Sequence, residues 1–88
     1  MKIKADFMLR SVAGQNVVVP VGNAAVDFNG MINLNESGAF LWKTLEGGAT
    51  EDELVSALLA EYDAPEAVAR ADVSSFVKKM REANLIDE

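Results

Sequence analysis

Short apolar and β-branched runs, separated by turn residues, make up the chain as far as Leu34. The runs are Phe7–Val12, Val17–Val21, Ala24–Phe28 and Met31–Leu34, and the turn residues are Gly14-Gln15-Asn16, Gly22-Asn23 and Asn29-Gly30. This pattern is typical of short antiparallel strands. Asn29-Gly30 is the strongest turn signal, because both residues tolerate the positive φ of a two-residue hairpin, so we predict that the runs on either side of it pair. Pro20 has no N–H to donate, so its strand should end there or turn that position away from a neighbour.

After Leu34 the apolar spacing changes to that of helices. Asn35 is a suitable N-cap, and Glu36 places a negative charge in the first turn, where the helix dipole favours it. The helix is predicted to reach Glu46 and to end at Gly47-Gly48. Its apolar residues, which are Phe40, Leu41, Trp42 and Leu45, surround most of its circumference. A helix that is apolar on so many sides should be the central one.

Two further helices follow. Thr50 and Glu53 have the spacing of a capping box and predict a helix to about Tyr62. Its apolar stripe consists of Leu54, Val55, Leu58, Leu59 and Tyr62. Pro65 suits the first turn of a third helix, which should run to about Ala83 and stop near Asn84, with Leu85-Ile86 as an apolar tail. The predicted fold class is therefore α+β: a small antiparallel sheet of three to four short strands, followed by three α-helices.

Composition limits the size and the chemistry of the protein. With 88 residues, half of them apolar and a quarter charged, the sequence predicts one packed domain over residues 1–88. It contains neither Cys nor His. The usual ligands of zinc, copper and haem are therefore missing, as is the side chain best suited to acid–base catalysis near neutral pH. We expect no enzyme activity, no metal and no cofactor.

Charge and hydropathy limit the partners. The net charge of −6 disfavours nucleic acid and anionic lipid surfaces as partners. The start of the chain, Met1–Asp6, is charged, and no run approaches the ~20 apolar residues of a membrane span. A cytoplasmic protein without membrane association is expected.

Two surfaces are candidates for binding another polypeptide. Met31, Ile32, Asn33 and Leu34 form the last predicted strand, and as an edge strand they could accept a strand from a second chain; alternatively, the protein's own chain covers this edge. On the third helix, Ala69, Val73, Phe76, Met80 and Ala83 form a core stripe. The adjacent line consists of Arg70, Ser74, Val77 and Arg81. This line is either a solvated flank or a ligand-facing surface on which Val77 provides contact area and the arginines bind carboxylates.

Three other features have simpler structural interpretations. Trp42 could stack on a ligand, but in so apolar a helix it is better placed in the core. The acidic cluster Glu51-Asp52-Glu53 could suggest a metal, yet the cap and the helix dipole explain it. The cations Lys78, Lys79 and Arg81 could contact phosphate, but their position near a helix C-terminus favours a role as dipole partners.

The sequence also resembles the PqqD-like family. The resemblance rests on Val17–Pro20, on Asn29–Trp42, on the Thr50–Leu59 helix, and on Asp72-Val73-Ser74-Ser75-Phe76 followed by Leu85-Ile86. It covers nearly the whole chain. It implies a winged-helix-like domain that recognises precursor peptides in the biosynthesis of ribosomally made natural products and presents them to a modifying enzyme, often a radical-SAM protein.

The resemblance also implies where the peptide binds. The leader segment of the precursor should add as a strand to the third strand of the sheet and lie beside the third helix. Carried onto this chain, the edge is Met31, Ile32, Asn33 and Leu34, and the helix wall is Arg70, Val73, Ser74 and Val77, with Arg81 at its end. The extra run Ala24–Phe28 departs from the family pattern, so either arm of its hairpin could be the third strand. The alternatives are a DNA-binding winged helix, and a docking subunit or homodimer with no free groove.

Overall fold

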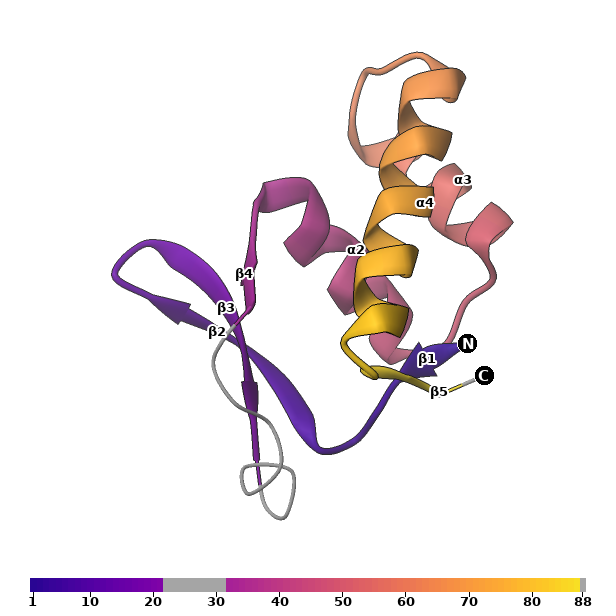
Figure 1. The fold of residues 1–88 in the computed structure, drawn as a ribbon. Helices are drawn as coiled ribbons and strands as arrows, with labels where there is room; N and C mark the ends of the chain where they lie inside the picture. The colour runs from indigo at the N-terminus through magenta and orange to yellow at the C-terminus, as the bar shows by residue number, and fades with distance from the viewer. Residues whose placement is uncertain (22–31, 88) are drawn as a thin grey trace.

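The computed structural model describes residues 1–21 and 32–87, which form two small antiparallel sheets and three helices. The larger sheet has the order β2-β3-β4, with bounds Phe7–Val12, Gln15–Pro20 and Ile32–Leu34. In the smaller sheet β1 (Lys2–Ile3) pairs with β5 (Ile86–Asp87). The helices are α2 (Glu36–Glu46), α3 (Glu51–Glu61) and α4 (Glu66–Glu82). The α+β, winged-helix-like fold class predicted from the sequence is confirmed (Figure 1).

The β2–β3 hairpin turns on two residues. Val12 pairs with Gln15, so Ala13 and Gly14 alone connect the strands. Both have positive φ, 52° and 80° respectively, as a turn that follows the twist of the strands requires. The predicted turn at Gly14-Gln15-Asn16 was therefore placed too late, because alanine rarely adopts this conformation and gives no turn signal. β3 ends at Pro20, as its missing N–H predicts.

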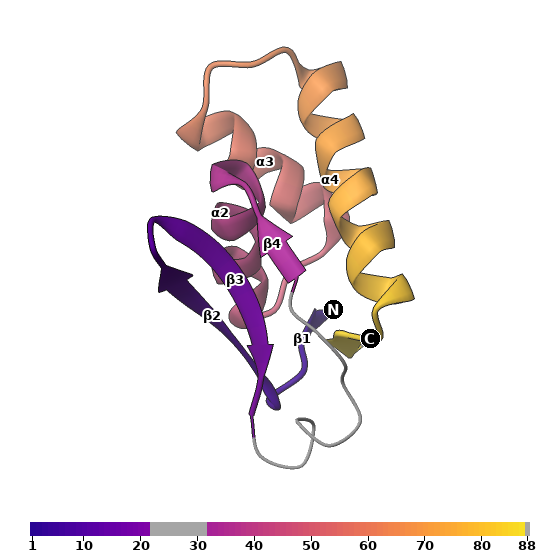
Figure 2. The same cartoon turned by 60° about the vertical axis from the view of Figure 1, so that its left-hand side comes forward.

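β4 is the edge strand of this sheet within the described residues. It pairs with β3 in the register Asn16↔Leu34, Val17↔Asn33 and Val18↔Ile32. Of the three strands of this sheet, β4 lies nearest to α4 (Figure 2). The run Ala24–Phe28 and its predicted pairing across Asn29-Gly30 lie outside the described residues.

Local capping sets the starts of α2 and α3 as predicted. The side chain of Asn35 accepts a hydrogen bond from the Gly38 N–H at 2.8 Å and begins α2. Thr50 and Glu53 form the reciprocal capping box of α3, at 3.1 and 2.9 Å. α4 begins after Pro65 and is followed by Asn84 in the left-handed conformation, φ 61°. These ends orient the helices around one core.

The central helix α2 packs against β1, β4, α3 and α4. Trp42 is fully buried at its centre, as expected for a core residue. The rings of Phe40 and Tyr62, with centroids 5.8 Å apart at 88°, join α2 to α3 in an edge-to-face contact. The remaining core residues of the three helices include Leu41, Leu45, Leu54, Leu58, Val73 and Met80. No described helix has the length and apolarity needed to span a membrane.

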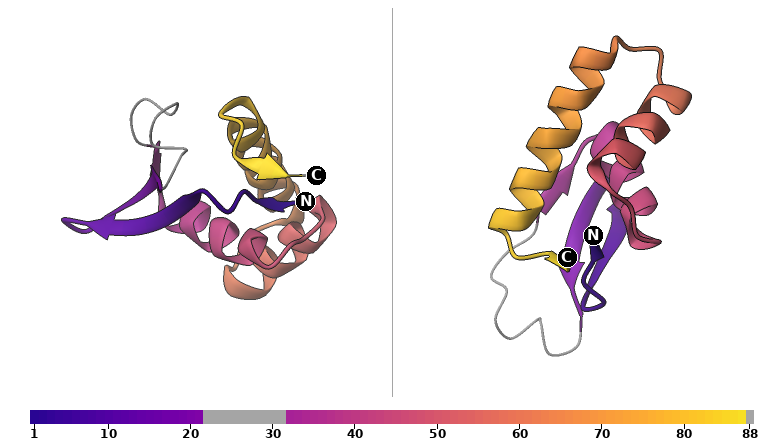
Figure 3. Two further views of the ribbon diagram at one scale, coloured as in Figure 1. Left: turned by 90° about the horizontal axis from the view of Figure 1, so that it is seen from below. Right: turned by 90° about the vertical axis from the view of Figure 1, so that its right-hand side faces the viewer.

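The two ends of the chain lie side by side (Figure 3). Leu85 and Ile86 are buried, 0% and 8% exposed, so the predicted apolar tail exists. The Lys4 N–H donates to the Leu85 carbonyl at 2.9 Å, and the Ala49 N–H donates to the Met1 carbonyl at 2.8 Å. The pairing of β1 with β5 was not predicted, because two-residue strands carry no recognisable period.

Candidate peptide-binding groove

A groove of about 430 Å³ separates the outer edge of β4 from α4. Its lining comes from β4, from the start of α2 and from one flank of α4: Asn33, Leu34, Asn35, Ser37, Gly38, Leu41, Asp72, Ser75, Phe76 and Lys79. The apolar members Leu34, Leu41 and Phe76 are buried, and the side chains of Asp72, Ser75 and Lys79 are exposed. The groove thus combines an apolar floor with a polar rim, the usual composition of a binding site for a ligand in extended conformation.

The backbone of Asn33 faces the groove. Its carbonyl accepts a hydrogen bond from the Lys79 Nζ across the groove, at a long 3.4 Å. In an antiparallel pair, a residue whose carbonyl points away from the neighbouring strand points its N–H the same way. The N–H and C=O of Asn33 are therefore the groups that β4 offers at the edge that no described strand occupies, whereas those of Ile32 and Leu34 face β3.

The edge is limited at its C-terminal end by α2. The next residue with outward backbone groups is Asn35, and its carbonyl already accepts the Ala39 N–H at 2.9 Å, as the helix begins. An added strand would therefore bond at Asn33 and extend toward Met31 rather than past Asn35. Met31, the fourth edge residue expected from the sequence, lies outside the described residues.

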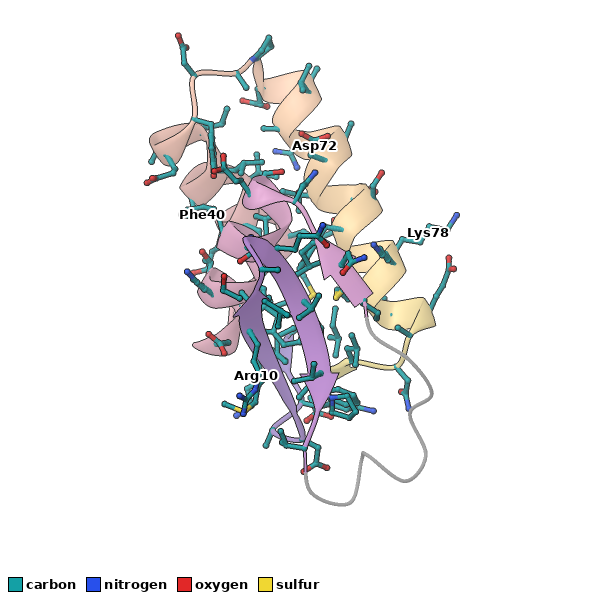
Figure 4. The ribbon with its side chains drawn as sticks, turned by 90° about the vertical axis from the view of Figure 1, so that its left-hand side faces the viewer. Arg10, Phe40, Asp72 and Lys78 are labelled. Carbon is teal, nitrogen blue, oxygen red and sulfur yellow. The ribbon has the colours of Figure 1, made fainter. Side chains whose placement is uncertain are left out.

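The flank of α4 that faces the groove follows from helical spacing. Asp72, Ser75, Phe76 and Lys79 stand at i, i+3, i+4 and i+7, and therefore share one face of the helix. In Figure 4 Asp72 lies in the upper part of α4, near the point where β4 leads into α2, and Lys78 points away from β4. Sequence reasoning missed this face, because polar residues flank the core stripe on both sides.

The arginines predicted as the helix wall lie on the opposite flank. Arg70 contacts Asp52 of α3 at 3.1 Å and Glu66 at 3.8 Å, and Arg81 contacts Glu51 of α3 at 3.9 Å. Ser74, exposed on the same helical line, is not among the residues that line the groove. The structure therefore does not bring Arg70, Ser74 and Arg81 together with β4. The physical reason is that α4 packs between α3 and the groove, and only one flank can face each.

The two valines predicted as wall residues are in the core. Val73 is 1% exposed and Val77 is fully buried. Neither valine presents an exposed surface, whereas the sequence-based expectation was that Val77 provides contact area. Of the residues predicted for the site, Asn33 and Leu34 line the groove, and Ile32 is half-buried in the same strand.

Among residues 1–21 and 32–87, no group of three acidic side chains is arranged to hold a metal ion. Glu53, from the acidic cluster considered above, is the capping partner of Thr50. Asp52 and Glu51 form ion pairs with α4.

Two solved structures share the fold of this chain. The structure of TbiB1 in complex with the TbiA(beta) leader peptide superposes with a TM-score of 0.77 at 22% identity, covering 99% of this chain and 95% of that one. The lasso peptide synthetase B1 complexed with its leader peptide gives 0.72 at 17%, covering 96% and 93%. At these identities the match shows a shared fold. No significant match was found among curated proteins.

The family assignment comes from the sequence itself. The family model described as "Coenzyme PQQ synthesis protein D (PqqD)" matches residues 15–86, from the start of β3 to the first residue of β5. This range includes β4, the groove-facing flank of α4 and all three helices. The chain therefore belongs to the PqqD family.

Proposed function

We propose that this protein is a non-catalytic peptide-binding module, which captures the leader segment of a ribosomally made precursor peptide by strand addition to β4. The observation that carries the proposal is the outward-facing backbone of Asn33 beside an apolar-floored groove. Main-chain hydrogen bonds to such an edge provide affinity that depends little on sequence, and side-chain contacts provide selectivity. Two solved proteins of the same fold bind leader peptides, as their descriptions state.

The proposal also includes an enzyme that modifies the bound precursor. The bound precursor would be presented in the cytoplasm to a modifying enzyme, of which a radical-SAM enzyme is the candidate that the family resemblance implies. The family takes its name from coenzyme PQQ synthesis, and one solved protein of the same fold is described as a lasso peptide synthetase. Co-purification with the enzyme encoded beside this protein would identify its class.

The first test is a titration of isotope-labelled protein with the N-terminal segment of a precursor peptide encoded nearby. Amide resonances of Asn33 and Leu34 and of Asp72, Ser75, Phe76 and Lys79 should shift, because these residues line the groove. Amides at the exposed end of β2, such as that of Val12, provide the internal control. Shifts confined to β2 would place the site on the other edge of the sheet, and the absence of shifts at saturating peptide would reject the proposal.

A sharper test removes one main-chain donor. Asn33→Pro deletes the outward N–H without removing a bond to β3, since proline is tolerated where the N–H of an edge strand faces solvent. We expect at least about tenfold weaker peptide binding, the equivalent of about 1.4 kcal/mol. Asn33→Ala keeps the N–H and is the matched control. Equal affinities for the two variants, with both folded by circular dichroism, would contradict strand addition at this edge.

A docking role is the second candidate. β2 forms the other edge of the sheet within the described residues, and Met8 and Val12 on it are 43% and 54% exposed. Such an edge could pair with a partner enzyme or with a second copy of the chain. Light scattering on the purified protein would reveal the homodimer, and a β2 charge substitution such as Met8→Lys should dissociate it.

A further inference from the structure

Lys79 occupies the acceptor that an added strand would need. Its Nζ donates to the carbonyl of Asn33, the one described β4 carbonyl placed toward the groove. Lys79 forms no ion pair with a described residue, and neither does Asp72 on the same flank. The ammonium therefore has the edge carbonyl as its protein partner there, through a long and weak hydrogen bond.

Strand addition would compete with Lys79 for this carbonyl. A backbone N–H of the incoming strand would take the Asn33 carbonyl, so the Lys79 Nζ would lose its partner while the peptide covers the groove. A partly desolvated ammonium without a partner is unfavourable, and a carboxylate is its strongest replacement. A peptide with an acidic side chain at this position restores the lost interaction, and a neutral peptide does not.

We propose that Lys79 is a specificity-determining residue, which selects segments with an Asp or Glu opposite Asn33. This inference rests on the proposed function and adds the chemistry of the ligand to it. Asp72 lies on the same flank, roughly 10 Å earlier at about 1.5 Å per residue. It gives the opposite end of the groove a negative charge. The preferred segment therefore carries its acidic residue at the Lys79 end and has no acidic residue at the Asp72 end.

Arg70 and Arg81 do not take this role. Both contact acidic residues of α3, on the other side of α4. Lys78 is adjacent in sequence but points away from β4 (Figure 4). Lys78 is therefore a matched control: it has the same charge, lies on the same helix and is also exposed, but it does not line the groove.

The test selects peptides from a phage-displayed library of random 15-residue segments on the immobilised protein. The wild type should enrich segments that share an acidic residue at one position. The Lys79→Glu variant should enrich segments with a basic residue at that position, and the Lys78→Glu variant should enrich the same segments as the wild type. If both variants shift the preference equally, or neither shifts it, the inference is overturned while peptide binding stands. If no segment is enriched, the proposed function fails as well.

A charge-swap cycle then measures the interaction. One enriched peptide and its Glu→Lys form are each titrated into wild-type protein and into Lys79→Glu by calorimetry. We expect each mismatched pair to bind about fivefold more weakly, and the doubly swapped pair to recover most of the loss. Losses that simply multiply, without recovery, would show that Lys79 does not contact the acidic residue.

Discussion

Ala13 has a backbone conformation that alanine rarely adopts. With φ 52° it precedes Gly14 in the two-residue turn between β2 and β3, where asparagine or glycine is the usual residue. The left-handed region costs an L-residue with a Cβ roughly 1–2 kcal/mol. The turn forms nonetheless, because the six-residue register of β2 and β3 determines the position of the connection.

Replacing Ala13 should therefore stabilise the protein. We expect Ala13→Asn to raise the free energy of unfolding by about 0.5–1 kcal/mol, since asparagine tolerates positive φ. Ala13 is exposed, so the larger side chain meets no packing constraint. Chemical denaturation of both proteins is the measurement. A lower midpoint for Ala13→Asn would contradict this explanation of the turn.

Asn35 links helix stability to the groove. Its side chain caps α2 and also lies on the groove wall. Loss of an N-cap costs about 1 kcal/mol in typical helices, so Asn35→Ala should lower the denaturation midpoint, while Asn35→Asp should retain most of the stability. Equal stability of the alanine variant would mean that the cap contributes little here.

At the scale of elements, the positions of the helices could be predicted from the sequence, but the flank of α4 that faces β4 could not. The caps at Asn35 and Thr50 are local signals, so the starts of α2 and α3 follow from a few residues. The core stripe of α4 follows from its period. Which flank of that stripe faces β4 depends on the packing of α3 against α4, which is a long-range property with no counterpart in the local pattern.

The ion pairs of Arg70, one with α3 and one within α4, allow a direct check of this flank assignment. Arg70→Gln removes two ion pairs with exposed partners, whose side chains are 84% and 70% exposed. Such pairs contribute about 0–1 kcal/mol, so stability should change little. Peptide affinity should remain the same within about twofold, because Arg70 does not line the groove. A large loss of peptide affinity in the folded variant would show that Arg70 takes part in peptide binding.

At the scale of the whole molecule, the net charge is opposite in sign to that expected of a DNA-binding winged helix. The net charge is −6, and two of the cations of α4, Arg70 and Arg81, contact carboxylates of α3. A phosphate backbone would have to compete with these contacts and with the overall repulsion. The DNA-binding alternative is therefore not favoured.

A gel-shift experiment tests this conclusion. We expect no complex between the protein and a random DNA duplex at low ionic strength, where electrostatic attraction is strongest. A basic winged-helix protein on the same gel serves as the positive control. A complex that dissociates as salt is added would restore the regulator as a candidate function.

Because Lys2–Ile3 pairs with Ile86–Asp87, this domain is suited to insertion into a larger protein. A polypeptide that enters and leaves at neighbouring points can be spliced into a surface loop of a larger enzyme without stretching its host. Linkers attached to β1 and to β5 would also begin at neighbouring positions. An enzyme fused to either end of the domain would therefore reach a bound peptide over a similar distance, whether the enzyme precedes or follows the domain in the sequence.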